Sequence, residues 1–414
     1  MAPITLAIIG AGSRGHTYAG FAEAFPDRVQ VVAVAEPRDA YRESLVASHG
    51  IAPDRAFLDW KDFVLHPRMA DAVVVSTQDH MHVGPAVACA SLGYDILLEK
   101  PMAPDLVGCR QVVDAVKRND TILGVCHVLR YTAYTRRLKQ LIVDGAIGDV
   151  VGLQRLEPVG FWHMAHSFVR GNWGNEAASG PMLLTKSCHD IDWIAHVLDV
   201  PCEAVSSFGS LKHFTPEEAP VGAGDRCLTC SVEGTCPYSA KRIYLEALWR
   251  GHRGWPVNVL TPDPSEQTVV AALSEGPYGR CVYTSDNDVV DHQVVSMAFA
   301  GGRTATFTMM AFTEMGHRAT HVFGTRGQIT GDGRFLHVYD FLSDNTEVID
   351  TEVGDGSILG GHGGGDFGLM DSFVRAVAEQ DRSAILSGPD ETLASHALVF
   401  AAEEARRRGC VVNL

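Results

Sequence analysis

Long apolar runs and basic clusters are both absent from this 414-residue sequence, and each absence excludes a class of protein. No apolar run approaches the length of a membrane-spanning helix. The formal net charge is -16 at pH 7 and no basic run offsets it locally, which disfavours nucleic acids and anionic membranes as partners. Because the first apolar strand begins at Ile4, we also expect no signal peptide. The sequence therefore predicts a cytoplasmic protein that binds neither membrane nor nucleic acid.

Charged residues are also scarce, at 20%, whereas 46% of the residues are hydrophobic. This balance excludes global disorder and provides enough apolar surface for a core without disulfides. The chain exceeds the length at which a single core keeps growing, so two domains are expected. In the cytoplasm its ten cysteines are expected to be thiols or metal ligands.

A glycine-rich turn follows the first apolar run, Ile4–Ile9. It reads Gly-Ala-Gly-Ser-Arg-Gly over residues 10–15, and its three glycines have separate roles in a dinucleotide-binding turn. Gly10 permits the tight bend, Gly12 lets the backbone approach a pyrophosphate, and Gly15 lets the following helix pack on the sheet. A strand before the turn and a helix after it favour a dinucleotide pocket over a purely structural turn.

An acidic residue, Glu36, follows the next apolar run, at the distance at which a carboxylate accepts the adenosine ribose hydroxyls. The same carboxylate would repel the 2′-phosphate of NADP, so we expect NAD, with NADP less favoured. Arg38 opposes this argument, because its guanidinium would neutralise that phosphate.

Five apolar runs alternate with helical patterns through the first part of the chain, which is typical of a doubly wound parallel sheet. The strands are expected at Ile4–Ile9, Val29–Ala35, Asp71–Ser76, Asp95–Leu98 and Thr121–Cys126. The helices are expected at Arg14–Phe25, Pro37–Ser48, Val83–Ser91 and Asp105–Arg118. Ligands of such sheets bind beyond the carboxyl ends of the strands. The further cofactor contacts predicted there are Ser13, Arg14, Thr77, Gln78, His82, Glu99, Lys100 and Arg130.

Beyond residue 150 the pattern changes to alternating segments, which favour a mainly antiparallel sheet with one face covered. The clearest segments are Val294–Phe299, Thr304–Met310, Ala319–Phe323 and Arg334–Tyr339, with helices expected at Asp190–Leu198, Asp366–Glu379 and Asp390–Arg408. We therefore expect an α/β chain with a dinucleotide-binding domain over residues 1–128 and an α+β substrate and oligomerisation domain over residues 129–414. Residues 212–264 are rich in Pro, Gly, Cys and charge, which indicates an excursion from the second sheet.

Three motifs together resemble the Gfo/Idh/MocA family of NAD(P)-dependent oxidoreductases. Glu99-Lys100-Pro101 closes the fourth parallel strand, Thr77 to His82 follow the third, and Leu184–Trp193 lies in the second domain. The family has an E-K-P tripeptide, a loop ending in histidine and a D-x-x-x-H-x-x-D helix at these places, and the resemblance covers nearly the whole chain. It implies a Rossmann domain, an antiparallel substrate domain, NAD or NADP, and sugar, polyol or cyclitol substrates.

Lys100 and His189 are the predicted catalytic residues. A lysine at the carboxyl end of a central strand is expected to be partly desolvated at the cofactor crevice, where it polarises or deprotonates a substrate hydroxyl. His189 keeps the family's histidine and is the natural proton acceptor. Thr185 stands where the family has an aspartate, so the basicity of His189 needs another source. Lys186 is predicted as a second catalytic group or a substrate ligand. The alternative for Lys100 is a solvated loop lysine paired with Glu99. The alternative for His189 is a histidine packed in the core.

The segment from Phe161 to Trp173 mixes aromatic rings with polar donors, a combination that sugar sites need. Packing on a strand face is the alternative. The substrate contacts predicted are Tyr131, Trp162, His163, His166, Arg170 and Trp173. The glycine-rich stretch 360–366 either brings His362 to the pocket mouth or forms a turn in which Asp366 caps the next helix.

Cys227, Cys230 and Cys236 have the dense spacing of thiolate metal ligands. A structural zinc would order an excursion whose own apolar content is too small to do so. Cys281 is the preferred fourth ligand, and Cys202, His213 and His252 are less favoured. The alternatives are free thiols and an iron–sulfur centre, which is disfavoured because hydride chemistry needs no one-electron relay.

These residues predict an enzyme, a NAD-dependent sugar or polyol dehydrogenase that transfers a hydride between NAD and a secondary hydroxyl of a sugar, cyclitol or glycoside. Two alternatives stay open. One is a redox-neutral, NAD-dependent glycosidase, and the other is a catalytically inactive sensor of NAD and sugar. An exposed face of the antiparallel sheet would favour a homodimer or homotetramer.

Overall fold

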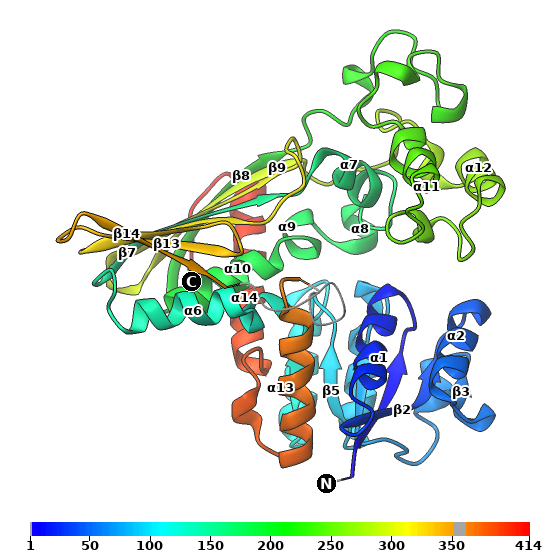
Figure 1. Ribbon diagram of the computed structural model, residues 1–414, viewed down its shortest axis with the longest axis horizontal. Helices are drawn as coiled ribbons and strands as arrows, with labels where there is room; N and C mark the ends of the chain where they lie inside the picture. Colours follow the sequence, from blue (N-terminus) through cyan, green and yellow to red (C-terminus); the bar gives the residue numbers. More distant parts are fainter. Residues whose placement is uncertain (1, 352–361) are drawn as a thin grey trace.

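The computed structural model describes residues 2–351 and 362–414 (Figure 1). Of the glycine-rich stretch considered above, Gly360 and Gly361 lie outside the described residues. Among the helices of the described residues, none is long and apolar enough to cross a membrane.

The N-terminal domain is built on a six-stranded sheet in the order β3-β2-β1-β4-β5-β6. Every pair is parallel, which confirms the doubly wound sheet. The strands are β1 (Ile4–Ile9), β2 (Val29–Ala35), β3 (Ala56–Phe57), β4 (Ala72–Val75), β5 (Asp95–Leu98) and β6 (Leu123–Val125). The helices are α1 (Ser13–Ala24), α2 (Asp39–His49), α3 (Trp60–Phe63), α4 (Val83–Ser91) and α5 (Leu106–Arg118). The strand order reverses between β1 and β4, so their carboxyl ends open the crevice in which such sheets bind ligands.

The second domain contains a nine-stranded sheet in the order β14-β13-β12-β11-β7-β10-β9-β8-β15. Among the strand pairs of the described residues, only β7 and β10 are parallel, so the expectation of a mainly antiparallel sheet is confirmed. The strands are β7 (Val150–Pro158), β8 (Cys202–Ser210), β9 (His292–Phe299), β10 (Arg303–Met310), β11 (Ala319–Gly324), β12 (Gly327–Gly331), β13 (Phe335–Asp340), β14 (Asn345–Asp350) and β15 (Val412–Asn413). The helices α6 (Ala133–Val143), α10 (Cys188–Leu198) and α14 (Pro389–Arg408) pack against this sheet.

Two C-terminal helices join the domains. The helix α13 (Gly365–Glu379) buries Leu369, Met370 and Phe373 in the core of the parallel sheet, and Figure 1 shows it standing beside that sheet. The long α14 contacts α5 and β6 of the first domain as well as β8 of the second. A domain boundary at residue 128 therefore does not describe the packing, because two helices that come after it pack on the first domain.

The excursion is longer than predicted, because it occupies the whole connection between the end of β8 at Ser210 and the start of β9 at His292. It forms the upper right lobe in Figure 1 and contains α11 (Glu246–Trp249) and α12 (Glu266–Glu275). Apolar side chains of the lobe join the core of the second domain: Phe214, Tyr238, Tyr244, Leu245, Val269 and Leu273.

Candidate active site

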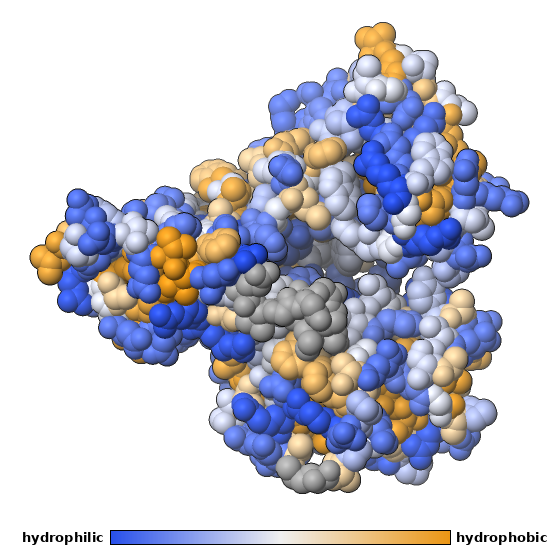
Figure 2. Space-filling model, viewed as in Figure 1, coloured by the Kyte–Doolittle hydropathy of each residue, from blue (hydrophilic) through white to orange (hydrophobic). Residues whose placement is uncertain are grey.

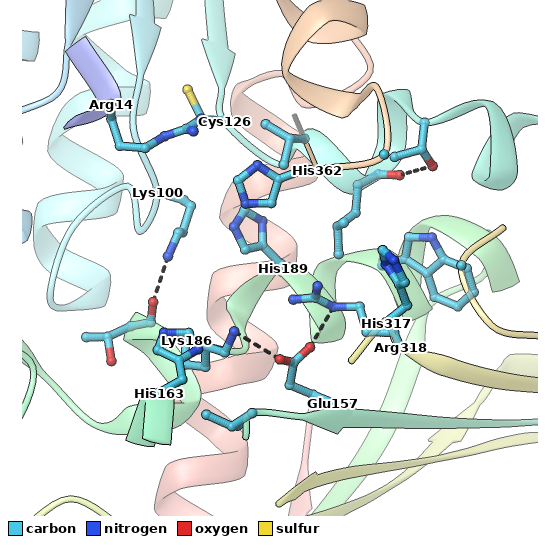
Figure 3. A pocket seen from close by; sticks show the side chains of 18 of the residues that line it. Arg14, Lys100, Cys126, Glu157, His163, Lys186, His189, His317, Arg318 and His362 are labelled. Atoms are coloured by element: carbon cyan, nitrogen blue, oxygen red, sulfur yellow. Dashed lines mark hydrogen bonds and ion pairs between the residues drawn. The ribbon is translucent and has the colours of Figure 1, made fainter. Parts of the chain in front are cut away.

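A cavity of about 700 Å³ lies between the two domains. Figure 2 shows the surface hollowed between the N-terminal half and the lobe above it. The residues that line the cavity from the first domain include Ser13, Arg14, Thr77, Asp79, Glu99 and Lys100. Those from the second domain include Glu157, His163, Trp173, Lys186, His189 and Arg318. Catalytic candidates far apart in the sequence therefore meet at one cavity (Figure 3).

The glycine turn at the edge of this cavity fits a dinucleotide. Gly10 has a φ of +93°, and a Cβ there would lie 2.6 Å from the Ser76 carbonyl oxygen. A Cβ on Gly15 would lie 2.1 Å from the carbonyl oxygen of Gly10, so the helix packs closely only with glycine at this position. Gly12 precedes α1 and caps it with no side chain, which leaves the first amides of the helix for a phosphate.

Glu36 and Arg38 form an ion pair beside this turn. The Glu36 carboxylate accepts from the Ala11 amide at 2.8 Å and from Arg38 Nε at 2.6 Å, and it is almost fully buried. Burial favours the neutral acid, but these hydrogen bonds outweigh it and lower the pKa of Glu36. Both oxygens of the Glu36 carboxylate are thus engaged, and the ion pair as a whole lies beside the turn.

Arg14 and Glu99 are joined below the turn. Arg14 Nε lies 2.6 Å from Glu99 Oε1, and Arg14 Nη2 lies 2.6 Å from Asp366 Oδ1. Burial opposes the charge on Glu99, but Arg14 and Lys100 outweigh it and lower the pKa of Glu99. Asp366 therefore anchors Arg14 from the helix α13, and it also pairs with His362, which lines the cavity.

Apart from the glycines of the turn and the pair Glu36 and Arg38 described above, three of the residues predicted to bind the cofactor lie outside the cavity lining. His82 has both ring nitrogens at backbone carbonyls, those of Pro101 at 2.7 Å and Thr77 at 3.2 Å, so it fastens two crevice loops together. Arg130 is buried against the Asp192 carboxylate, with both hydrogen bonds at 2.7 Å. Gln78 is exposed and precedes a short helical turn. The structure brings Ser13, Arg14, Thr77, Glu99 and Lys100 to the cavity.

Lys100 reaches across the domain interface. It follows β5, and its Nζ donates to the Thr185 carbonyl oxygen at 2.7 Å. Thr185 ends the short helix α9 (Met182–Thr185), where only its backbone carbonyl contacts the lysine. The residue that replaces the family's aspartate thus still provides an acceptor for the lysine, but a neutral one.

His189 lies at the start of α10 and lines the same cavity. Burial, and after it the positive charge of Lys100, lower the pKa of His189 well below its usual value. Its Nδ1 has no hydrogen-bond partner within the described residues, and its ring meets that of the buried His127 edge to face at 5.7 Å. His127 Nδ1 in turn lies 3.6 Å from Asp192 Oδ2, so a carboxylate approaches the outer ring of this pair. His189 is therefore a neutral imidazole, which is the form that accepts a proton.

Lys186 belongs to a network of five charged side chains at the floor of the cavity. Its Nζ lies 2.9 Å from Glu157 Oε1, and Glu157 Oε2 lies 2.8 Å from Arg318 Nε. Arg318 also pairs with Asp190 at 2.8 Å, and Asp190 pairs with Arg155 at 2.7 Å. Arg155 and Glu157 share one face of β7, because side chains alternate along a strand. Lys186 is thus held as a hydrogen-bond donor.

Two of the predicted substrate residues, His163 and Trp173, line the cavity. Trp173 Nε1 donates to Asp79 Oδ2 at 2.9 Å across the domain interface. Burial raises the pKa of Asp79, which places a carboxyl of reduced acidity beside Lys100.

The other four predicted substrate residues are not brought to the cavity lining. Tyr131 is fully buried, and its hydroxyl lies 2.9 Å from Ser387 Oγ. His166 bonds to the Tyr244 hydroxyl at 2.8 Å. Trp162 packs on Trp255, which itself lines the cavity. Arg170 turns into the lobe, as described next. Aromatic and polar composition alone did not separate these packing residues from those that face the cavity.

The predicted structural zinc is not supported by the structure. Within residues 2–351 and 362–414, no group of three or more His, Cys, Asp or Glu side chains is arranged to hold a metal ion. Cys227, Cys230, Cys236 and Cys281 do line one small cavity, so their spacing brought them together, but all four are free thiols.

Protein groups take the place that the zinc was expected to have. Arg170 Nε donates to the Arg280 carbonyl at 2.7 Å, and its Nη2 contacts the Tyr238 carbonyl at 2.9 Å and Cys227 Sγ at 3.3 Å. Apolar side chains of the lobe also pack into the core of the second domain, a contribution that the sequence analysis underestimated. A buried arginine that crosslinks backbone carbonyls, together with this core, orders the excursion.

Several residues of the cavity were missed from the sequence. Asp79 could have been predicted, because it lies in the motif from Thr77 to His82 and directly follows Gln78, a predicted cofactor contact. Glu157 and Arg318 gave none, because each is an isolated charged residue at a strand end and only the folded sheet brings them to Lys186.

The parallel sheet, the glycine turn and the paired catalytic candidates define a NAD-binding oxidoreductase of two domains. Residues 4–127 match the family model described as an oxidoreductase family with an NAD-binding Rossmann fold, and residues 139–414 match that of the C-terminal alpha/beta domain of the same family. The chain belongs to the Gfo/Idh/MocA family.

Individual relatives are distant. The protein YteT of Bacillus subtilis is 25% identical over 360 residues, which are 80% of this chain and 78% of YteT. The 2,7-anhydro-N-acetylneuraminate hydratase of Escherichia coli is 21% identical over 275 residues, or 66% of this chain and 68% of that enzyme. The structure of levoglucosan dehydrogenase with NADH and levoglucosan shares the fold, with a TM-score of 0.70 at 18% identity over 99% of each chain.

Proposed function

We propose that this protein transfers a hydride between NAD and a secondary hydroxyl of a sugar, cyclitol or glycoside. The observation that carries the proposal is the convergence of Lys100 and His189, from different domains, on one cavity that also reaches the glycine turn. The levoglucosan dehydrogenase structure supports the substrate class, since its ligands are a sugar derivative and NADH.

A bound nicotinamide cofactor would supply the hydride-transfer chemistry. The turn at Gly10 to Gly15 would hold its pyrophosphate and Glu36 its adenosine ribose. The preference for NAD rests on the carboxylate of Glu36, which would repel a 2′-phosphate and which binds Arg38 through Nε and Nη2.

The residues of the chain then manage the hydroxyl proton. His189, held neutral by burial, accepts the proton of the carbinol oxygen. The ammonium of Lys100 donates to the same oxygen and stabilises the negative charge that develops as the proton leaves. The Thr185 carbonyl oxygen accepts a hydrogen bond from one of the three N–H groups of Lys100, and this contact orients the other two.

The test is to incubate the purified protein with NAD and a panel of monosaccharides, cyclitols and glycosides while NADH absorbance and product are both followed. Formation of NADH in proportion to the oxidised product supports the proposal. Binding of NAD and sugars without any turnover would instead identify the sensor, and it would refute the proposed enzyme.

A second function is favoured by one relative. The Escherichia coli enzyme is named a hydratase, and a hydration involves no net oxidation of the substrate. The second candidate for this chain is accordingly a redox-neutral reaction such as NAD-dependent glycoside cleavage. Cleavage of a glycoside that requires NAD but leaves no net NADH would establish it in place of the dehydrogenase.

We also propose a cytoplasmic homodimer or homotetramer. The cytoplasmic location rests on the composition described above. The assembly rests on the face of the second sheet opposite its helices, where Val151, Phe208 and Val294 are exposed. Light scattering at several protein concentrations tests the assembly, and a monomer at all of them contradicts it.

A further inference from the structure

The charged network at the floor of the cavity contains more cations than anions. Arg155, Lys186 and Arg318 are joined through only two carboxylates, those of Glu157 and Asp190. Both carboxylates are almost fully buried and shared between neighbouring cations. Among the described residues the network therefore carries one positive charge in excess, and three of its members, Arg155, Glu157 and Asp190, are buried.

Such an excess is costly unless a ligand compensates it, because a low-dielectric site solvates an isolated charge poorly. Two of the histidines that line the cavity, His163 and His189, add no further charge. Burial and the neighbouring Lys186 lower the pKa of His163 well below its usual value, and burial with Lys100 does the same to His189. Both are neutral, so they add donors and acceptors without changing the balance of charge.

Two cations of the network also have unused donors. Within the described residues, no hydrogen bond uses Nη1 of Arg318, and Lys186 Nζ has only its ion pair with Glu157. Figure 3 shows the guanidinium of Arg318 directed into the cavity beneath His189, with Lys186 on the same side of the cavity as Glu157. An arginine fork and an ammonium group that converge on one space suit the oxygens of a carboxylate.

We infer that the substrate is a sugar acid, whose carboxylate binds Arg318 and Lys186 while a secondary hydroxyl of the same molecule reaches Lys100 and His189. This inference rests on the proposed function and specifies its substrate class. A carboxylate, with one negative charge, balances the single excess charge, whereas a phosphate would exceed it. In Figure 3 Lys100 and Arg318 lie on opposite sides of His189, and all three residues line the same cavity of about 700 Å³.

The experiment compares matched pairs of ligands with the NADH-loaded protein. Calorimetry compares the affinity of glucuronate and of galacturonate with that of the parent aldose. In a second assay, with NAD supplied, the rate of NADH formation is compared for the same compounds. We expect at least one acid to bind about tenfold or more tightly than its parent, the effect of one charge-assisted contact. The preference should weaken as NaCl is raised. Equal binding of acid and parent, or no binding of either acid, overturns the inference, and so does tighter binding of glucose 6-phosphate.

The variant Arg318→Gln removes one of the two carboxylate contacts. It should reduce the preference for the acid over the parent aldose to about threefold or less, whereas Arg318→Lys should keep part of the preference. Lys186→Met provides an independent test if Arg318→Gln fails to fold. An acid preference that survives both variants contradicts the assignment.

Failure of the inference and failure of the proposed function give different results. NADH formation from neutral sugars, with no preference for acids, refutes the acid substrate and leaves the dehydrogenase. Tight binding of an acid, with no NADH formed from any compound, refutes the dehydrogenase and leaves the carboxylate site.

Discussion

The Nζ atom of Lys100 lies 2.7 Å from the carbonyl oxygen of Thr185, so the catalytic lysine candidate of the Rossmann domain is oriented by the backbone of the other domain. Thr185 stands at the position of the family's aspartate. The contact is therefore made by a group that no side-chain substitution removes, and it adds no negative charge beside His189.

Replacement of Lys100 by Met should lower turnover by about a hundredfold or more, because the developing negative charge on the substrate oxygen loses its cation. Affinity for NAD should be unchanged, since the glycine turn holds the phosphates. Steady-state rates and NAD titration measure the two effects. Lys61→Met, at an exposed position on α3, is the matched control. Wild-type turnover in Lys100→Met would refute the catalytic assignment.

Replacement of Thr185 by Val should change turnover by less than about threefold. The side-chain hydroxyl makes one long contact of 3.4 Å, to the Pro181 carbonyl, whereas the contact to Lys100 is made by the backbone. A neutral hydrogen bond of ordinary strength contributes about 1 kcal/mol to stability, so the thermal midpoint should change little. A large loss of turnover in a well-folded Thr185→Val protein would show that the hydroxyl itself acts in the reaction.

His189 and Lys186 should differ in what they contribute. His189→Ala removes the neutral acceptor and should lower kcat by about a hundredfold with NAD affinity intact. Lys186→Ala should act mainly on KM, because Lys186 is held as a donor by Glu157. Kinetics of both variants on one substrate decide the roles. If Lys186→Ala lowers kcat more than His189→Ala, the proton acceptor is the lysine.

Replacement of Glu36 by Gln should weaken NAD binding by about tenfold and strengthen NADP binding. The change removes the carboxylate that repels a 2′-phosphate and releases Arg38 from its ion pair. Glu43→Gln, exposed on α2, is the control. Titration of each protein with both cofactors tests this prediction, which fails if wild type already prefers NADP.

Stability should fall as the pH drops from about 6.5 towards 4. Burial lowers the pKa of His166, His196 and His396 to about 4, whereas an unfolded histidine titrates near 6.5. The unfolded chain therefore binds these protons first, and the stability conferred by the neutral histidines is complete above about pH 6.5 and lost below it. Each pKa unit corresponds to about 1.4 kcal/mol.

Thermal midpoints across this pH range measure the effect. The variant His396→Gln should flatten the dependence, whereas His80→Gln, at an exposed position, should not. A midpoint that stays constant between about pH 6.5 and 4.5 would contradict the prediction, because carboxylates with lowered pKa values lose their contribution only at more acidic pH.

Much of the first domain was predictable because its signals are local. The glycine turn, the apolar runs and the lysine after β5 each occupy a few consecutive residues, and a parallel sheet places all of their carboxyl ends on one edge. The strands β1 and β2 and the helix α4 were predicted with their observed bounds. The two-residue β3 was missed, because a pattern so short has no periodicity to detect.

By itself, the sequence determined the class of fold, the dinucleotide turn and the position of Lys100, since each depends on neighbours along the chain. Only the tertiary structure decided that α13 completes the core of the first domain, that Arg130 and Arg170 are buried anchors, and that Glu157, Lys186 and Arg318 share one cavity. The physical reason is that a buried charge is defined by its partners, and those partners come from strands and helices distant in sequence.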